Sequence, residues 1–92
     1  MTKLVVTAKV KDVSKWEENF RTHQEMFRAN GVSSPIYIGS NDDGEVALVE
    51  EVADIDALMG TMDSPEMQAA LKLDGVIAES VKFFVLNRDF SF

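Results

Sequence analysis

The chain has 92 residues, enough for one domain with its own core, and its 46% apolar and 27% charged content excludes a disordered chain. Nine basic and sixteen acidic residues give a net charge of −7 without a basic cluster, so nucleic acid and anionic membrane surfaces are not expected as partners. The absence of cysteine excludes disulfides, thiolate metal sites and cysteine nucleophiles.

The expected location is the cytoplasm. The sequence has no run of roughly 18 apolar residues, so no membrane span is predicted. Met1 to Val10 also lacks the basic, apolar and small-residue order of a secretory leader.

The first predicted elements are a strand over Leu4–Val10 and a helix over Asp12–Gly31. At about 100° per residue, the helix places three rings and the only histidine on one apolar stripe, flanked by charged residues. These four residues are Trp16, Phe20, His23 and Phe27. Asp12 or Ser14 would cap the helix start, and Ser14 with Glu17 matches a capping box, while Asn30-Gly31 would end the helix.

Two strands joined by a turn are predicted next, over Val32–Ser40 and Glu45–Val52. Pro35 lacks a backbone N–H, so we expect the earlier strand at the edge of the sheet. The turn, residues 41–44, is acidic, but it lacks the alternating ligands and the distal glutamate of a calcium loop, so no metal site is predicted.

A short helix capped by Asp54 is expected to stop at Met62-Asp63, and Ser64-Pro65 then begins a second helix that Gly75 ends. Methionines at helical spacing along this segment favour either core packing or a pliable ligand surface. The last predicted strand covers Glu79–Asn87, and two more rings, Phe90 and Phe92, follow it.

The order strand, helix, strand, strand, helix, strand predicts an α+β protein: a single ferredoxin-like domain over residues 1–92 with a split β-α-β topology. Its four-stranded antiparallel sheet would carry helices on one face. The strands are nevertheless apolar on both faces, and exposing a set of large side chains such as Val5, Val49, Phe84 and Leu86 forgoes on the order of 10 kcal/mol. We therefore expect a homodimer that pairs sheet to sheet, with the tail rings clasping the partner.

The chain resembles the dimeric α/β-barrel superfamily over nearly its whole length. The resemblance rests on Asp12-Val13-Ser14-Lys15-Trp16 at the start of a helix, on Phe20, His23 and Gly31, and on Ala53-Asp54, Ser64-Pro65-Glu66 and Gly75-Val76. That superfamily includes antibiotic-biosynthesis-type monooxygenases, haem-degrading enzymes and muconolactone isomerase-like proteins, so the resemblance implies a fold more than a reaction.

The resemblance implies a ligand pocket between the sheet and the helices, with His23 in its wall. His23 has two interpretations: a catalytic base, or a packed side chain bonded to a backbone carbonyl. Tyr37 is the second catalytic candidate, as a hydrogen-bond donor into the same space, or else a residue of the barrel rim. The expected lining consists of Trp16, Phe20, Phe27, Met59 and Met62.

The sequence departs from the better-known members of the superfamily. Haem-degrading members carry an asparagine on the first strand, where this chain has Thr7, and the asparagine, tryptophan and tyrosine set of the quinone-forming enzymes has no match here. No cofactor is expected. The predicted function is cofactor-independent monooxygenation or isomerisation of a small aromatic or polyketide-like molecule, and the alternative is a non-catalytic ligand-binding or assembly module.

Overall fold

The computed structural model describes residues 2–92, apart from the side chain of Ser34. Its elements are β1 Thr2–Lys9, α1 Val13–Phe20, α2 Gln24–Ala29, β2 Val32–Ser40, β3 Glu45–Val52, α3 Ile55–Met62, α4 Pro65–Leu73, the 3-10 turn η1 Ala78–Ser80 and β4 Lys82–Leu86. Within the described residues, none of the helices combines the length and apolarity that crossing a membrane requires.

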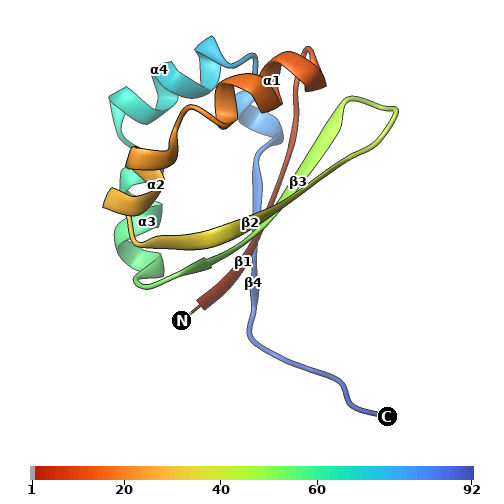
Figure 1. The fold of residues 1–92 in the computed structure, drawn as a ribbon, viewed down its shortest axis with the longest axis vertical. Coiled ribbons are helices and arrows are strands. Elements are labelled where there is room, and N and C mark those ends of the chain that lie inside the picture. The colour runs from red at the N-terminus through yellow and green to blue at the C-terminus, as the bar shows by residue number, and fades with distance from the viewer. Residues whose placement is uncertain (1) are drawn as a thin grey trace.

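The strands form one antiparallel sheet in the order β2-β3-β1-β4, and Figure 1 shows the helices on one side of it. The predicted α+β class, ferredoxin-like topology and antiparallel sheet are therefore confirmed. β2 lies at an edge, as the position of Pro35 predicted, and its pairing with β3 is irregular between Ser33 and Tyr37.

The single helix predicted over Asp12–Gly31 is wrong, because the segment forms two helices. After α1 the hydrogen bonds tighten: the backbone N–H groups of Thr22 and His23 donate to carbonyls three residues back, both at 3.0 Å. The Thr22 hydroxyl also donates to the Asn19 carbonyl at 2.6 Å. This side-chain bond competes with the helical pattern, so the chain turns before His23 and restarts as α2.

The other boundaries differ little from the prediction. β2, β3 and the two helices after β3 occur where they were expected, and Asp54 and Ser64 accept the capping hydrogen bonds from Ala57 and Met67. The first strand ends at Lys9, and Val10 forms an isolated bridge with Val76. The last strand is shorter than predicted, because η1 occupies its expected start.

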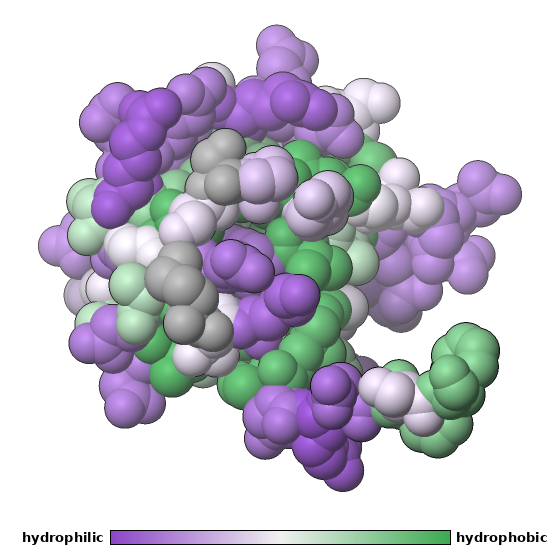
Figure 2. All heavy atoms as spheres, turned by 60° about the horizontal axis from the view of Figure 1, so that its bottom comes forward, coloured by the Kyte–Doolittle hydropathy of each residue, from purple (hydrophilic) through white to green (hydrophobic). Residues whose placement is uncertain are grey.

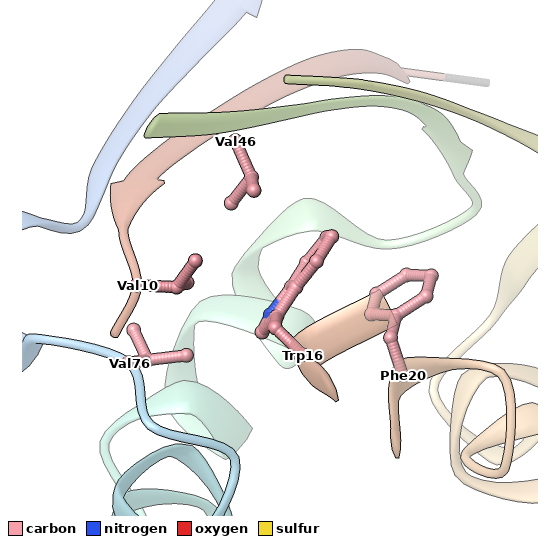
Figure 3. Close-up of a cluster of buried hydrophobic side chains, with 5 residues drawn as sticks. All are labelled: Val10, Trp16, Phe20, Val46 and Val76. Carbon is pink, nitrogen blue, oxygen red and sulfur yellow. The ribbon is translucent and has the colours of Figure 1, made fainter. Parts of the chain in front are cut away.

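The core between the sheet and the helices consists of two hydrophobic clusters. In the first, the rings of Trp16 and Phe20 extend from α1 toward β3, and Figure 3 shows them beside Val46, Val10 and Val76. The members of the second cluster come from three strands and α3: Leu4, Val32, Val52 and Leu58. Phe27 packs against both clusters and so joins them.

The opposite face of the sheet is open and carries apolar side chains near its centre, with charged residues such as Lys3 and Glu51 on the same face. Val5 is in register with Val49 on one side and with Phe84 on the other, so the three side chains lie together on that face. Phe84 is half exposed. Figure 2, which brings the bottom of Figure 1 forward, shows hydrophobic and hydrophilic residues side by side there. Beyond β4 the tail stands away from the body, and Phe90 and Phe92 are stacked with 5.9 Å between ring centroids.

Candidate functional site

A cavity of about 100 Å³ lies between the sheet and the helices. Most of its wall is apolar and is shared by both core clusters, with rings from α1 and α2 and methionines from α2, α3 and α4. An engineered protein cavity of roughly 150 Å³ binds benzene. The present cavity is smaller than that one, so a single-ring ligand requires some of the cavity's methionine side chains to move.

His23 and Asp74 lie within ion-pair distance of each other in the wall of this cavity. The Nε2 atom of His23 lies 2.9 Å from Oδ2 of Asp74, and the two residues are 51 positions apart in the chain. Two helix ends bring them together: His23 precedes α2, and Asp74 is the C-cap of α4, followed by Gly75 in the left-handed conformation. The Asp74 side chain is 10% exposed and that of His23 is 27% exposed, so the imidazole is nearer to solvent.

The carboxylate determines which nitrogen of His23 carries a proton. An ionised carboxylate can only accept, so Nε2 must be the donor in this hydrogen bond. In the neutral imidazole, Nδ1 then carries the free lone pair. The ring also meets Phe27 edge-on, with 6.4 Å between centroids, and this contact limits its rotation. His23 is thus bonded to a carboxylate, and the interpretation in which its ring bonds a backbone carbonyl does not describe this structure.

Glu50 is the second acidic group in the cavity wall. It lies on β3 between inward-facing neighbours of the two clusters, and it is only 6% exposed. Burial raises the pKa of the Glu50 carboxyl above 4.5, its ordinary value. Among the described side chains, none donates a hydrogen bond to it.

Asn30 also borders the cavity, and each of its polar side-chain atoms makes one hydrogen bond within the protein. Its Nδ2 donates to the Met26 carbonyl at 2.8 Å, and its Oδ1 accepts from the Thr61 hydroxyl at 3.1 Å. Asn30 therefore links the end of α2 to α3.

The structure brings together most of the residues that the sequence selected, with two exceptions. His23, Trp16, Phe20, Phe27 and Met62 all line the cavity, whereas Met59 does not. Tyr37 is in register with Val49 on the open face and is 67% exposed, so the sheet separates it from His23, contrary to the predicted pairing.

The candidates selected from the sequence did not include two groups of the site, Glu50 and Asp74, although either Glu50 or Glu51 was expected to point inward or toward the dimer interface. Strand alternation in β3 places Glu50 on the same face as Val46 and Val52, which is a usable signal. Asp74 carried no such signal, because its position depends on how α4 ends against α2. Within residues 2–92, no three acidic or histidine side chains lie close enough together to hold a metal ion. Glu50 and the His23–Asp74 pair are therefore two separate polar groups in the lining of one cavity.

The chain has a ferredoxin-like α+β fold, and solved structures described as antibiotic biosynthesis monooxygenases share this fold. No protein-family model matches the chain, and no curated protein matches it by sequence. Solved structures match over nearly the full length.

Three of these structures illustrate the similarity. SnoaB, a cofactor-independent oxygenase from Streptomyces nogalater, superimposes with a TM-score of 0.67 at 12% identity, covering 98% of this chain and 94% of that one. A protein from Bordetella bronchiseptica provisionally named an antibiotic biosynthesis monooxygenase gives 0.70 at 16% identity, with 97% of each chain covered. Another antibiotic biosynthesis monooxygenase gives 0.64 at 14% identity, covering 97% and 99%. At these identities the similarity shows the fold alone.

Proposed function

We propose that this protein is a small proton-transfer enzyme that acts on a mostly apolar molecule of about one ring, as a cofactor-independent monooxygenase or isomerase. The observation that carries the proposal is the His23–Asp74 pair in the wall of an otherwise apolar cavity. A base needs a free lone pair, an orienting partner and access to the ligand. Asp74 is the orienting partner of His23, and His23 lines the cavity, which supports this role. SnoaB, which shares the fold, is a cofactor-independent oxygenase.

In the proposed reaction, Nδ1 of His23 removes a proton from an acidic C–H or O–H group of the ligand. The imidazolium that forms is stabilised by the Asp74 carboxylate, whose Oδ2 accepts the hydrogen bond from Nε2–H of His23 at 2.9 Å. The ligand anion then follows one of two courses. Return of the same proton to another atom completes an isomerisation, whereas reaction with dioxygen converts a CH₂ group to a carbonyl group and releases one water.

The second part of the proposal is that the protein acts as a homodimer. The open sheet face carries Val5, Val49 and Phe84, and the exposed tail rings lie beyond the end of β4. Covering such a face with the same face of a second copy removes large apolar side chains from water on both subunits. The ligand cavity lies on the other side of the sheet, within one subunit.

The test of catalysis measures proton transfer directly. Wild-type protein is incubated in deuterium oxide with enolisable single-ring ketones such as phenylacetone, and loss of the α-proton signal is followed by NMR. We expect His23→Ala to slow exchange by about 100-fold or more. Asp74→Asn should slow it by about tenfold, because the imidazolium loses its anionic partner.

Asp63→Asn is the matched control. Asp63 is the C-cap of α3, as Asp74 is of α4, but it is exposed, so exchange should stay at the wild-type rate. Circular dichroism and light scattering establish that each variant keeps its fold and mass. Full exchange activity in folded His23→Ala would overturn the proposal and leave a non-catalytic ligand-binding or assembly module.

A further inference from the structure

The proposed reaction uses one end of the cavity and leaves Glu50 without a role. Of the titratable residues that line the cavity, Glu50 on the sheet is the most buried, at 6% exposed, and His23 on the helix side is the least. Glu50 also lies where the two core clusters meet on β3, between Val46 and Val52. The cavity lining thus includes a buried carboxyl group on the sheet as well as the His23–Asp74 pair on the helix side.

The side chains that surround Glu50 give no packing reason for a carboxyl group at this position. Its register partner on β1 is Leu4, which is fully buried, and the neighbouring cation Lys3 lies on the opposite face in register with Glu51. Burying a carboxyl group without a partner costs free energy, and an apolar side chain of similar size would avoid that cost. A group that is unfavourable for packing and faces a cavity is suited to hold a ligand.

We propose that Glu50 orients the ligand by donating a hydrogen bond from its carboxyl group to a carbonyl or hydroxyl oxygen at the inner end of an uncharged, single-ring molecule. This inference rests on the proposed function, because the opposite end of the same molecule then reaches His23. The inferred substrate is a single-ring molecule with two polar ends, and the end that contacts Glu50 is a hydrogen-bond acceptor.

Three observations favour an uncharged ligand over an ammonium group. An ammonium group has three N–H donors, and among the described sheet residues that line the cavity Glu50 is the only one with a carboxyl group. Most of the cavity lining is apolar, so a buried ion pair would lack the further hydrogen bonds that offset its desolvation. The raised pKa of Glu50 also favours the protonated form, which can donate to an oxygen.

The experiment compares three ligands of the same shape: acetophenone, ethylbenzene and 1-phenylethylamine. The indole N–H signal of Trp16 reports binding by NMR, because Trp16 is the only tryptophan of the chain and lines the cavity. Wild-type protein should bind acetophenone about tenfold more tightly than ethylbenzene, which is the effect of one hydrogen bond. Glu50→Gln keeps a donor and should keep the preference, whereas Glu50→Leu should lose it.

Glu51→Leu is the matched control, since Glu51 is the next residue on β3 and lies on the open face, and it should keep the preference. The inference is overturned if the amine binds more tightly than the ketone, if ketone and ethylbenzene bind equally or not at all, or if Glu50→Leu keeps the preference. His23→Ala should also keep it. A ketone preference without proton exchange would therefore remove the proposed function alone, and exchange without the preference would remove this inference alone.

Discussion

Glu50 couples the stability of the protein to pH because its carboxyl group is buried beside a cavity. Burial raises its pKa in the folded chain above the value near 4.5 that it has when exposed, so the folded state binds the proton more tightly than the unfolded state does. Below that value both states are protonated. As pH rises from about 4.5 toward the raised pKa, the unfolded state loses its proton while the folded state keeps it, so stability falls. Above the raised pKa both states are ionised and the loss is complete.

We therefore predict that Glu50→Gln is more stable than the wild type at neutral pH and that this difference shrinks toward acid pH. The amide cannot ionise, so the variant lacks the decline that Glu50 causes. Urea unfolding from about pH 4 to about pH 8 at one protein concentration measures both curves. Glu18→Gln, at an exposed position on α1, should follow the wild type. Parallel curves for wild type and Glu50→Gln would contradict the prediction.

At this scale the sequence predicted residues whose environment depends on local periodicity. His23 and the rings of Trp16, Phe20 and Phe27 repeat along one helical stripe, and all of them line the cavity. Asp74 depends on the meeting of two helix ends, which no local pattern encodes. Tyr37 was predicted to act with His23 only because its hydroxyl can donate a hydrogen bond. Its register with Val49 places it on the open face of the sheet, opposite the cavity.

The helix termini follow the capping residues closely. The sequence left Asp12 and Ser14 open as the cap of the first helix, and in the structure the Lys15 N–H donates to Asp12 Oδ1 at 3.1 Å, while Ser14 is exposed. The break before α2 was missed because the charged and apolar stripes continue through it. What interrupts the helix is the hydroxyl of Thr22, which bonds the Asn19 carbonyl and has no effect on the hydrophobic pattern.

The two candidate caps give a test at the level of the helix. Asp12→Ala should lower the free energy of unfolding by about 1 kcal/mol, because an N–H at the start of α1 loses its acceptor. Ser14→Ala should change it by less than about 0.5 kcal/mol, as expected for an exposed residue without a capping role. Urea unfolding monitored by Trp16 fluorescence measures both variants. An equal loss in the two would show that the capping bond has no measurable effect.

For the whole molecule, the sequence predicted the topology because each strand and helix has its own periodicity and the crossover rule leaves few arrangements. It also predicted an apolar open face, and the register of β1 with β3 and β4 brings Val5, Val49 and Phe84 together on it. The size of the cavity lay outside local patterns, since it depends on how the two core clusters pack around Glu50.

The proposed dimer can be tested on that face without disturbing the fold of one subunit. Phe84 is half exposed in the single chain, so Phe84→Asp should leave the subunit folded while placing a charge on each sheet of the pair. We expect the dimer dissociation constant to rise at least about thirtyfold, which corresponds to about 2 kcal/mol. Leu73 is exposed on α4, away from the sheet, so Leu73→Asp is the matched control and should leave association unchanged.

Light scattering over a concentration series measures association. Wild-type protein and Leu73→Asp should show twice the 10.2 kDa chain mass at concentrations where Phe84→Asp shows a single chain. A chain that ends at Arg88 removes Phe90 and Phe92, and weaker association of that chain would show that the tail rings contact the partner. A wild-type mass near 10.2 kDa at micromolar concentration would refute the dimer, whereas the cavity, enclosed on the helix side of one subunit, would still be testable by proton exchange.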